Sequence, residues 1–301
     1  MNASPILAVT GASGYVGSII VGASKGEAET VSLVRAPTAE DQIAFSFGGD
    51  MDLLAQHLRE RRVTHLIHAA WDMQASSAQE VKRICVGGSL DLLAAARRAG
   101  VEKFIFISTI SAFQGARSTY GRSKLEVEQA FREAGGLVLR LGLVYGDRAG
   151  GVFGSMKKIA VTSPIIPLIG DGSAPQYLLD EETLGDVIRR AVRGEFASEA
   201  QLLTLAHPTP VAFRDILSQI AGACGGRPIF LPTPWRLTYF AACYLERLGF
   251  QGKLKSDSIL SYVHQNPAPD FGPMRRCAID PPPFCRARVA PSSLGGTPER
   301  K

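Results

Sequence analysis

The first half of the chain alternates short apolar runs with longer segments of helical periodicity. Residues 86–100 are one such helical segment and end at Gly100, a residue typical of a helix C-terminus. Strands that alternate with helices imply right-handed βαβ units. The sequence therefore predicts a doubly wound α/β fold whose parallel sheet is covered on both faces. Six runs have the length and composition of buried strands: ILAVT (6–10), TVSLV (30–34), IAFSF (43–47), THLIHAA (64–70), KFIFIS (103–108) and LVLRL (137–141).

A glycine-rich turn, TGASGYVG, follows the first expected strand directly. Glycine permits the tight turn at position 11, close approach of the backbone to a pyrophosphate at 14, and packing of the next helix against the strand at 17. The amides that begin this helix would face the phosphates. Because the turn lies between a strand and a helix, we expect it to bind a dinucleotide. The candidate contacts are Gly11, Ser13, Gly14, Tyr15, Val16 and Gly17.

The end of the second expected strand indicates which dinucleotide is bound. An acidic residue there accepts hydrogen bonds from the adenosine ribose and repels a 2′-phosphate. This chain instead has SLVRAP, with Arg35 and no carboxylate. NADP is therefore favoured over NAD, with a solvated surface arginine as the alternative role of Arg35.

Composition and charge point away from several other classes of protein. The 301 residues are 46% apolar and 20% charged, as in an ordinary soluble globular protein. Four of the five net positive charges lie from residue 273 onward, and no basic stripe with interleaved aromatics predicts a nucleic-acid partner. The five cysteines are scattered without metal-ligand spacing, so we expect free thiols, a reducing compartment and no metal site.

The chain shows no signal-peptide pattern and no apolar stretch long enough to cross a bilayer, so we expect a cytoplasmic protein. The most apolar later segment, 235–250, leaves open a peripheral contact with a membrane or a partner. After residue 148 the alternating pattern loosens. We expect residues 1–148 to form the dinucleotide-binding domain and 149–272 a smaller, mostly helical substrate lobe interleaved with elements that return to the sheet. Residues 273–301, rich in Pro, Arg and Ser, are expected to be a disordered basic tail.

Five motifs occur in order along the chain: TGASGYVG, HLIHAA, FIFIST, YGRSK and LRLGLVYGD. Together they resemble the extended short-chain dehydrogenase/reductase superfamily, and within it the NAD-dependent epimerase/dehydratase family. The resemblance covers residues 5–260 and is specific before residue 148. Segments 111–128 and 255–271 also resemble epimerase-like proteins of bacterial surface-polysaccharide gene clusters.

The resemblance implies three catalytic side chains. Tyr120 would donate or accept the proton at a substrate hydroxyl or carbonyl, and Thr109, with Ser108 and Ser111 as alternatives, would hydrogen-bond the same oxygen. Lys124 would bind the nicotinamide ribose, and its charge would lower the pKa of the tyrosine. Tyr120 and Lys124 stand four residues apart, which puts both on one face of a helix. Further cofactor contacts implied by the family are Asp50, Met51, Ala69 and Ala70.

Several positions depart from the nucleotide-sugar members of that family. Ile110 and Ser111 replace the Asp-Glu pair of 4,6-dehydratases, so dehydration is disfavoured, whereas epimerisation or carbonyl/alcohol redox is retained. The loop 110–119 is shorter than in most of those members. Cys85 replaces an asparagine that supports the active site, and Gln176 replaces an arginine that clamps the substrate diphosphate. The candidate substrate contacts are Ser111, Arg148 and Gln176.

The sequence thus favours an NADP- or NAD-dependent epimerase or oxidoreductase that acts on a sugar or nucleotide-sugar, with the nicotinamide carrying the hydride. One alternative is the same chemistry on a lipid-like or steroid-like ketone or alcohol, which the apolar segment 235–250 and the missing arginine favour. Another is a non-catalytic NADP-binding scaffold or redox sensor, against which the intact Thr/Tyr/Lys set argues. The resemblance also suggests a homodimer paired through the helix of Tyr120 and the helix before it.

Overall fold

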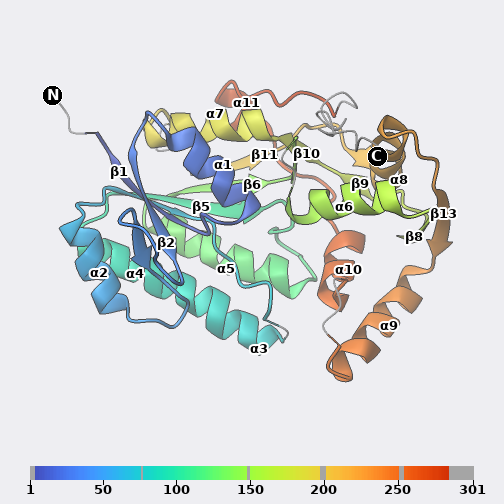
Figure 1. The fold of residues 1–301 in the computed structure, drawn as a ribbon, viewed down its shortest axis with the longest axis horizontal. Helices are drawn as coiled ribbons and strands as arrows, with labels where there is room; N and C mark the ends of the chain where they lie inside the picture. The colour runs from blue at the N-terminus through green and yellow to red at the C-terminus, as the bar shows by residue number, and fades with distance from the viewer. Residues whose placement is uncertain (1–3, 76, 148–149, 197–200, 251–253, 285–301) are drawn as a thin grey trace, which may run out of the picture.

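The protein folds around a seven-stranded parallel sheet in the order β11-β6-β5-β4-β1-β2-β3 (Figure 1). This computed structural model describes residues 4–75, 77–147, 150–196, 201–250 and 254–284. The predicted doubly wound α/β fold is confirmed. The strands of the sheet are β1 (Ile6–Thr10), β2 (Glu29–Val34), β3 (Gln42–Ala44), β4 (His65–His68), β5 (Lys103–Thr109), β6 (Leu137–Leu141) and β11 (Leu202–Leu205).

Helices cover both faces of this sheet, as Figure 1 shows. Leu7 and Val9 point into one core and Ala8 into the other, because successive side chains of a strand alternate between its faces. The first face carries α1 (Tyr15–Ser24), α7 (Glu181–Val192) and α11 (Gly272–Arg276). The second carries α2 (Met51–Glu60), α4 (Gly88–Ala99) and α5 (Thr119–Glu133), with α3 (Ala78–Glu80) and the π-helix η1 (Val81–Gly87) leading into α4.

Two of the expected strands are shorter in the structure. β3 ends at Ala44 rather than at residue 47, although Phe45 remains buried. β4 ends at His68, because the next two amides leave the ladder to donate to the Thr10 side chain. Gly100 ends α4 in the left-handed conformation, with φ +87°, as predicted.

The second half of the chain builds a smaller lobe and also returns to the main sheet. β11 pairs with β6, and α7 packs on α1. A third core cluster lies under α6 and α8. The elements of the lobe are β7 (Leu143–Tyr145), α6 (Gly151–Thr162), β8 (Ile165–Ile169), β9 (Pro175–Gln176), β10 (Leu178–Asp180), β12 (Val211–Ala212), α8 (Phe213–Ala223), β13 (Ile229–Thr233), α9 (Trp235–Arg247) and α10 (Ser256–Val263).

The prediction of a disordered tail is wrong for residues 273–284. Met274 is fully buried in the first core, together with Phe271 and Ile279. The ring of Phe284 packs edge-on against Tyr145. These buried side chains are widely spaced among prolines and arginines. The average composition of the segment is therefore polar, and it does not reveal them. Residues 285–301, with Cys285, lie outside the described part of the chain.

No helix in the described part of the chain is long and apolar enough to span a bilayer. Within the same residues, no group of three or more His, Cys, Asp and Glu side chains is placed to hold a metal ion.

Candidate active site

Two positions of the glycine-rich turn must be glycine, because a Cβ atom there would clash with neighbouring backbone atoms. Gly11 adopts φ +70°, and a Cβ there would lie 2.9 Å from the amide nitrogen of Ala70. A Cβ on Gly17 would lie 1.9 Å from the carbonyl oxygen of Gly11, inside any permissible contact distance. Ser13 and Gly14 are exposed at the start of α1, where a pyrophosphate would bind, and the Gly14 amide closes the turn by donating to the Gly11 carbonyl oxygen at 2.9 Å. The turn therefore fits a dinucleotide.

A buried network fixes the end of β4 beside this turn. The Thr10 hydroxyl accepts hydrogen bonds from the amides of Ala69 and Ala70 at 3.0 and 3.1 Å. It also lies 2.7 Å from His68 Nδ1, and Nε2 of the same ring lies 2.8 Å from Ser89 Oγ. Burial, with a smaller effect of Lys124, lowers the pKa of His68 to about 3, so the ring is neutral. Thr10 is a positioning residue that sequence reasoning missed.

The remaining predicted cofactor contacts lie at the same edge of the sheet. Arg35 is exposed directly after β2. Asp50 Oδ1 caps α2 by accepting from the amides of Asp52 and Leu53 at 3.0 and 2.9 Å, while Met51 packs against the second core. Asp50 therefore has a structural role in addition to the cofactor contact implied by the family.

The three predicted catalytic residues meet where β5 ends and α5 begins. Thr109 is the last residue of β5, and its side chain lies near enough to that of Tyr120, in the first turn of α5, to lower the pKa of the tyrosine, an effect that burial outweighs. Lys124, one turn further on, donates to the carbonyl oxygen of Ile107 at 2.9 Å. Ser118 caps this helix by accepting from the Gly121 amide at 3.1 Å. The helical spacing thus brings the tyrosine and the lysine to the end of the same strand.

The two serines considered as alternatives to Thr109 have other places. Ser108 Oγ donates to Glu128 Oε1 at 2.5 Å, and Arg140 binds both oxygens of that carboxylate. Ser108 is thereby tied to a buried ion pair behind the site. Ser111 is half-buried, and its amide donates to Thr109 Oγ1 at 3.2 Å. Its predicted role as a substrate contact stays a prediction.

The pKa values of Tyr120 and Lys124 differ from the expectation that the lysine lowers the pKa of the tyrosine. Burial raises the pKa of Tyr120 to about 12. Burial also lowers the pKa of Lys124 to about 7, a shift that the nearby Cys85 and Glu128 oppose. The lysine is only 3% exposed, and its ammonium lies 4.2 Å from the centre of the Trp71 ring. The enclosed site thus favours the neutral form of both groups.

Two contacts from distant parts of the chain complete the site. Asp257, in the first turn of α10, accepts from the amides of Thr119 and Tyr120 at 2.6 and 3.0 Å. The Trp71 ring meets the Tyr120 ring edge-on, with 5.9 Å between centres. Neither residue belongs to a motif, and a pairing across 137 residues leaves no local signal in the sequence. A carboxylate at the N-terminus of α5 also suits the helix dipole.

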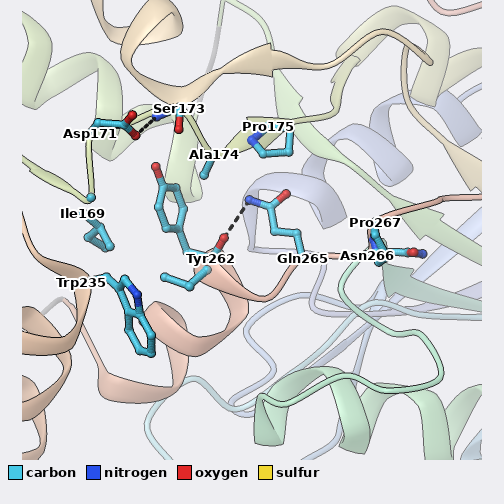
Figure 2. Close-up of a pocket in the computed structure, with 12 residues that line it drawn as sticks. Ile169, Asp171, Ser173, Ala174, Pro175, Trp235, Tyr262, Gln265, Asn266 and Pro267 are labelled. Atoms are coloured by element: carbon cyan, nitrogen blue, oxygen red, sulfur yellow. Dashed lines mark hydrogen bonds between the residues drawn. The ribbon is translucent and has the colours of Figure 1, made fainter.

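A pocket of about 320 Å³ lies between the β8–β9 connection, α9 and α10 (Figure 2). The Tyr262 hydroxyl is buried, has no hydrogen-bond partner among the described residues, and points toward the segment that carries Ser173 and Ala174. Burial raises the pKa of Tyr262 to about 12, helped by Asp171. The described lining contains no Lys or Arg. It consists of Ile169, Gly170, Asp171, Ser173, Ala174, Pro175, Trp235, Tyr262, Val263, Gln265, Asn266 and Pro267.

Gln176 lies in β9 next to this pocket, with its amide 3.4 Å from the carbonyl oxygen of Ala174. It is not one of the residues that line the pocket. Arg148 lies outside the described residues. Cys85 is buried in η1, with its thiol 3.6 Å from the Asp72 carbonyl oxygen, and burial raises its pKa.

Comparison with known proteins agrees with this geometry. The model of the NAD dependent epimerase/dehydratase family matches residues 7–175, more than half of the chain. The chain belongs to the NAD-dependent epimerase/dehydratase family. The matched region contains the glycine-rich turn and all three predicted catalytic residues, whereas Asp257 and Tyr262 lie beyond it.

Individual known proteins resemble this chain to different extents. A UDP-glucose 4-epimerase of Azospirillum brasilense is 30% identical over 164 residues, which are 44% of this chain and 45% of that protein. The match thus spans less than half of that epimerase. A ceramide reductase of Caulobacter vibrioides is 28% identical over 252 residues, or 79% of this chain and 77% of the reductase. The Thermus thermophilus UDP-glucose 4-epimerase complex with NAD has a TM-score of 0.63 and 23% identity, over 86% of this chain and 97% of that chain, which shows the shared fold.

Proposed function

We propose that this member of the family is an NAD(P)-dependent epimerase or carbonyl/alcohol oxidoreductase in which Tyr120 moves the proton at a substrate oxygen. The observation that carries the proposal is the proximity of the Tyr120 and Thr109 side chains at the end of β5, with Lys124 one turn further along α5. Two neighbouring hydroxyl groups can both hydrogen-bond the same carbonyl or alcohol oxygen of a substrate. When bound at Gly11 to Gly17, the nicotinamide cofactor supplies or accepts the hydride.

The electrostatics of the site fit this role in both directions. Because burial keeps Tyr120 protonated, the phenol is ready to donate to a carbonyl oxygen as that oxygen gains negative charge. A protonated Lys124 then stabilises the resulting tyrosinate, and its pKa of about 7 makes proton exchange accessible near neutral pH. Water elimination is not part of the proposal, since Ile110 and Ser111 follow Thr109 without an acid-base pair.

We also propose that NADP is the preferred cofactor. Arg35 is exposed just after β2, where a 2′-phosphate on the adenosine ribose would gain a charged partner. The Thermus thermophilus relative described above was solved with NAD, so the proposed preference for NADP rests on the residues of this chain alone.

The test of the chemistry is the Tyr120→Phe variant, with Tyr177→Phe as a control whose ring packs against Phe271. We expect Tyr120→Phe to lower turnover by a factor of about 10² or more and to leave NADPH affinity, measured by its fluorescence, nearly unchanged. A fully active Tyr120→Phe protein would contradict the proposal. Net consumption of NADPH during turnover would identify a reductase, and turnover without it an epimerase.

Two substrate classes are compatible with this chemistry. The pocket lined by Trp235 and Tyr262 without a described Lys or Arg favours an uncharged, largely apolar ketone or alcohol, and the ceramide reductase supports this class over most of both chains. A nucleotide-sugar is the second candidate, supported by the UDP-glucose 4-epimerase relatives. Thermal-shift titration of the NADPH-loaded protein with UDP-glucose and with a long-chain ketone separates the two.

A further inference from the structure

Helix α9 and the residues after it expose an apolar surface at the outer edge of the smaller lobe (Figure 1). We call it the α9 face; it consists of Leu237, Phe240, Tyr244, Leu248 and Phe250, each between 57% and 65% exposed. The three helical members and the C-cap residue Leu248 recur every three or four residues, so they share one side of the helix. Ala242 is the single buried residue of α9. Such an exposed apolar surface usually marks a contact with a partner or a membrane.

The opposite side of α9 holds the helix against the lobe. The Trp235 ring meets His264 edge-on, with 5.7 Å between ring centres. The Glu246 carboxylate accepts from both the amide and the hydroxyl of Ser256, each at 2.7 Å. The helix is therefore anchored, and its apolar face is turned outward by that anchoring.

Positive charge borders the α9 face. Arg236 and Arg247 are exposed and stand about three helical turns apart, which puts both on the same side of the helix. The carboxylate between them in sequence, Glu246, is engaged with Ser256. Aromatic and leucine side chains flanked by arginines are the pattern of a helix that lies in a bilayer interface with anionic headgroups.

The same region is connected to the catalytic tyrosine. Lys255, at the start of α10, donates to the carbonyl oxygens of Met73 and Ala75 at 2.6 and 3.2 Å. Met73 is 64% exposed, and two residues before it Trp71 packs against Tyr120. Lys255 thus ties the start of α10, the helix that follows α9, to the segment whose Trp71 packs against Tyr120 and Lys124.

We propose that the α9 face docks on the surface of an anionic phospholipid bilayer, and that the ketone or alcohol presented to Tyr120 is carried by a lipid in that bilayer. The docking rests on the surface of α9 itself, whereas the identity of the substrate as a lipid rests on the proposed function. A bilayer complements both parts of the surface, because apolar side chains enter the interface while the arginines meet the headgroups.

Flotation of the full chain with vesicles tests the docking. The vesicles are pure phosphatidylcholine or phosphatidylcholine with phosphatidylglycerol. The variants are the double change Phe240→Asp and Leu248→Asp, the double change Arg236→Glu and Arg247→Glu, and the control Val161→Asp, at an apolar residue of α6 that is 49% exposed. All five positions are exposed, so each variant should fold, which circular dichroism checks.

We expect the wild type and Val161→Asp to bind the anionic vesicles and to be released by salt. The aspartate pair should weaken binding about tenfold or more, because charges replace inserted apolar groups, and the glutamate pair should also weaken it about tenfold or more. No flotation of the wild type, or equal flotation of the aspartate pair, would overturn the proposal. So would a wild-type dimer in solution that the aspartate pair dissociates, since the face would then pair two copies of the chain.

The Tyr120→Phe variant separates this proposal from the proposed chemistry. It should float like the wild type and fail to oxidise or reduce any substrate. A fully active Tyr120→Phe variant would contradict the proposed chemistry and would not affect the docking proposal. A third outcome would contradict the lipid substrate and leave the docking intact. In that case the wild type binds anionic vesicles, but the wild type and the aspartate pair turn over a soluble nucleotide-sugar equally well.

Discussion

The cofactor side and the substrate side of the site are built in different ways. On the cofactor side, Gly11 follows β1 and Thr109 ends β5, with β4 between these two parallel strands, and Gly17 lies in the first turns of α1. Short motifs fix these positions. On the substrate side, Asp257 comes from α10, a helix that reaches Tyr120 only through tertiary packing, and the same helix carries Tyr262 of the pocket. Local geometry therefore determines the first region, whereas long-range contacts determine the second, and substrate specificity is free to change without disturbing the cofactor site.

The largest expected effect tests the local rule on the cofactor side. Gly17→Ala places a methyl group against the Gly11 carbonyl oxygen, so we expect a loss of about 3 kcal/mol or more in unfolding free energy, together with loss of cofactor binding. Gly22→Ala, on the same helix with open space around its Cβ, should be neutral or stabilise by up to about 1 kcal/mol. Denaturant unfolding measures both. Equal behaviour of the two variants would mean that α1 shifts freely and that the turn is not tightly determined.

The second prediction concerns Lys124, which sits where the two regions meet. Its pKa in the folded protein, about 7, lies below the usual 10.5, so the folded state binds fewer protons between these values. Stability should therefore rise with pH above about 7, by an amount on the order of 2 kcal/mol up to pH 9. Lys124→Met lacks this group, so its stability relative to the wild type should be greatest below pH 7 and should fall as the pH rises. Thermal unfolding at pH 6 and pH 9 tests this, and an unchanged difference would contradict it.

The third prediction breaks the link between the regions. Asp257→Ala removes the acceptor for the Thr119 and Tyr120 amides, so we expect a loss of about 1 to 2 kcal/mol in stability. Because Tyr120 would lose its fixed position, turnover should fall about tenfold while NADPH affinity is retained. Asp257→Asn, which keeps one acceptor oxygen, should be intermediate. Asp215→Ala, in the first turn of α8, is the control. Parallel losses of turnover and cofactor affinity would show a general structural role instead.

The same contrast explains how much the sequence could predict. The alternation of strands and helices follows from apolar periodicity, and the common face of Tyr120 and Lys124 follows from helical spacing. The place of Thr109 beside them was implied by the family resemblance. The cap supplied by Asp257 and the ring of Trp71 over Lys124 could not be predicted, because each depends on how distant segments pack. The raised pKa of Tyr120 was also missed, since it arises from burial and no motif reports burial. The prediction for residues 273–284 was wrong because a few buried apolar side chains, such as Met274, hold the segment in place although its average composition is polar.

The smallest expected effect concerns Arg35, an exposed residue at the outer edge of the cofactor side. Arg35 is exposed, so its contact with a 2′-phosphate would be screened by salt and should contribute about 1 kcal/mol. Arg35→Ala should therefore weaken NADPH binding by a factor of about five to ten at low salt, and NADH binding hardly at all. Lys25→Ala, an exposed basic residue at the end of α1, controls for the general loss of positive charge. Fluorescence titration with both cofactors at two salt concentrations gives the comparison. Equal losses for NADH and NADPH would show that Arg35 is a solvated surface charge, and that the rule of local motifs ends at the glycine-rich turn.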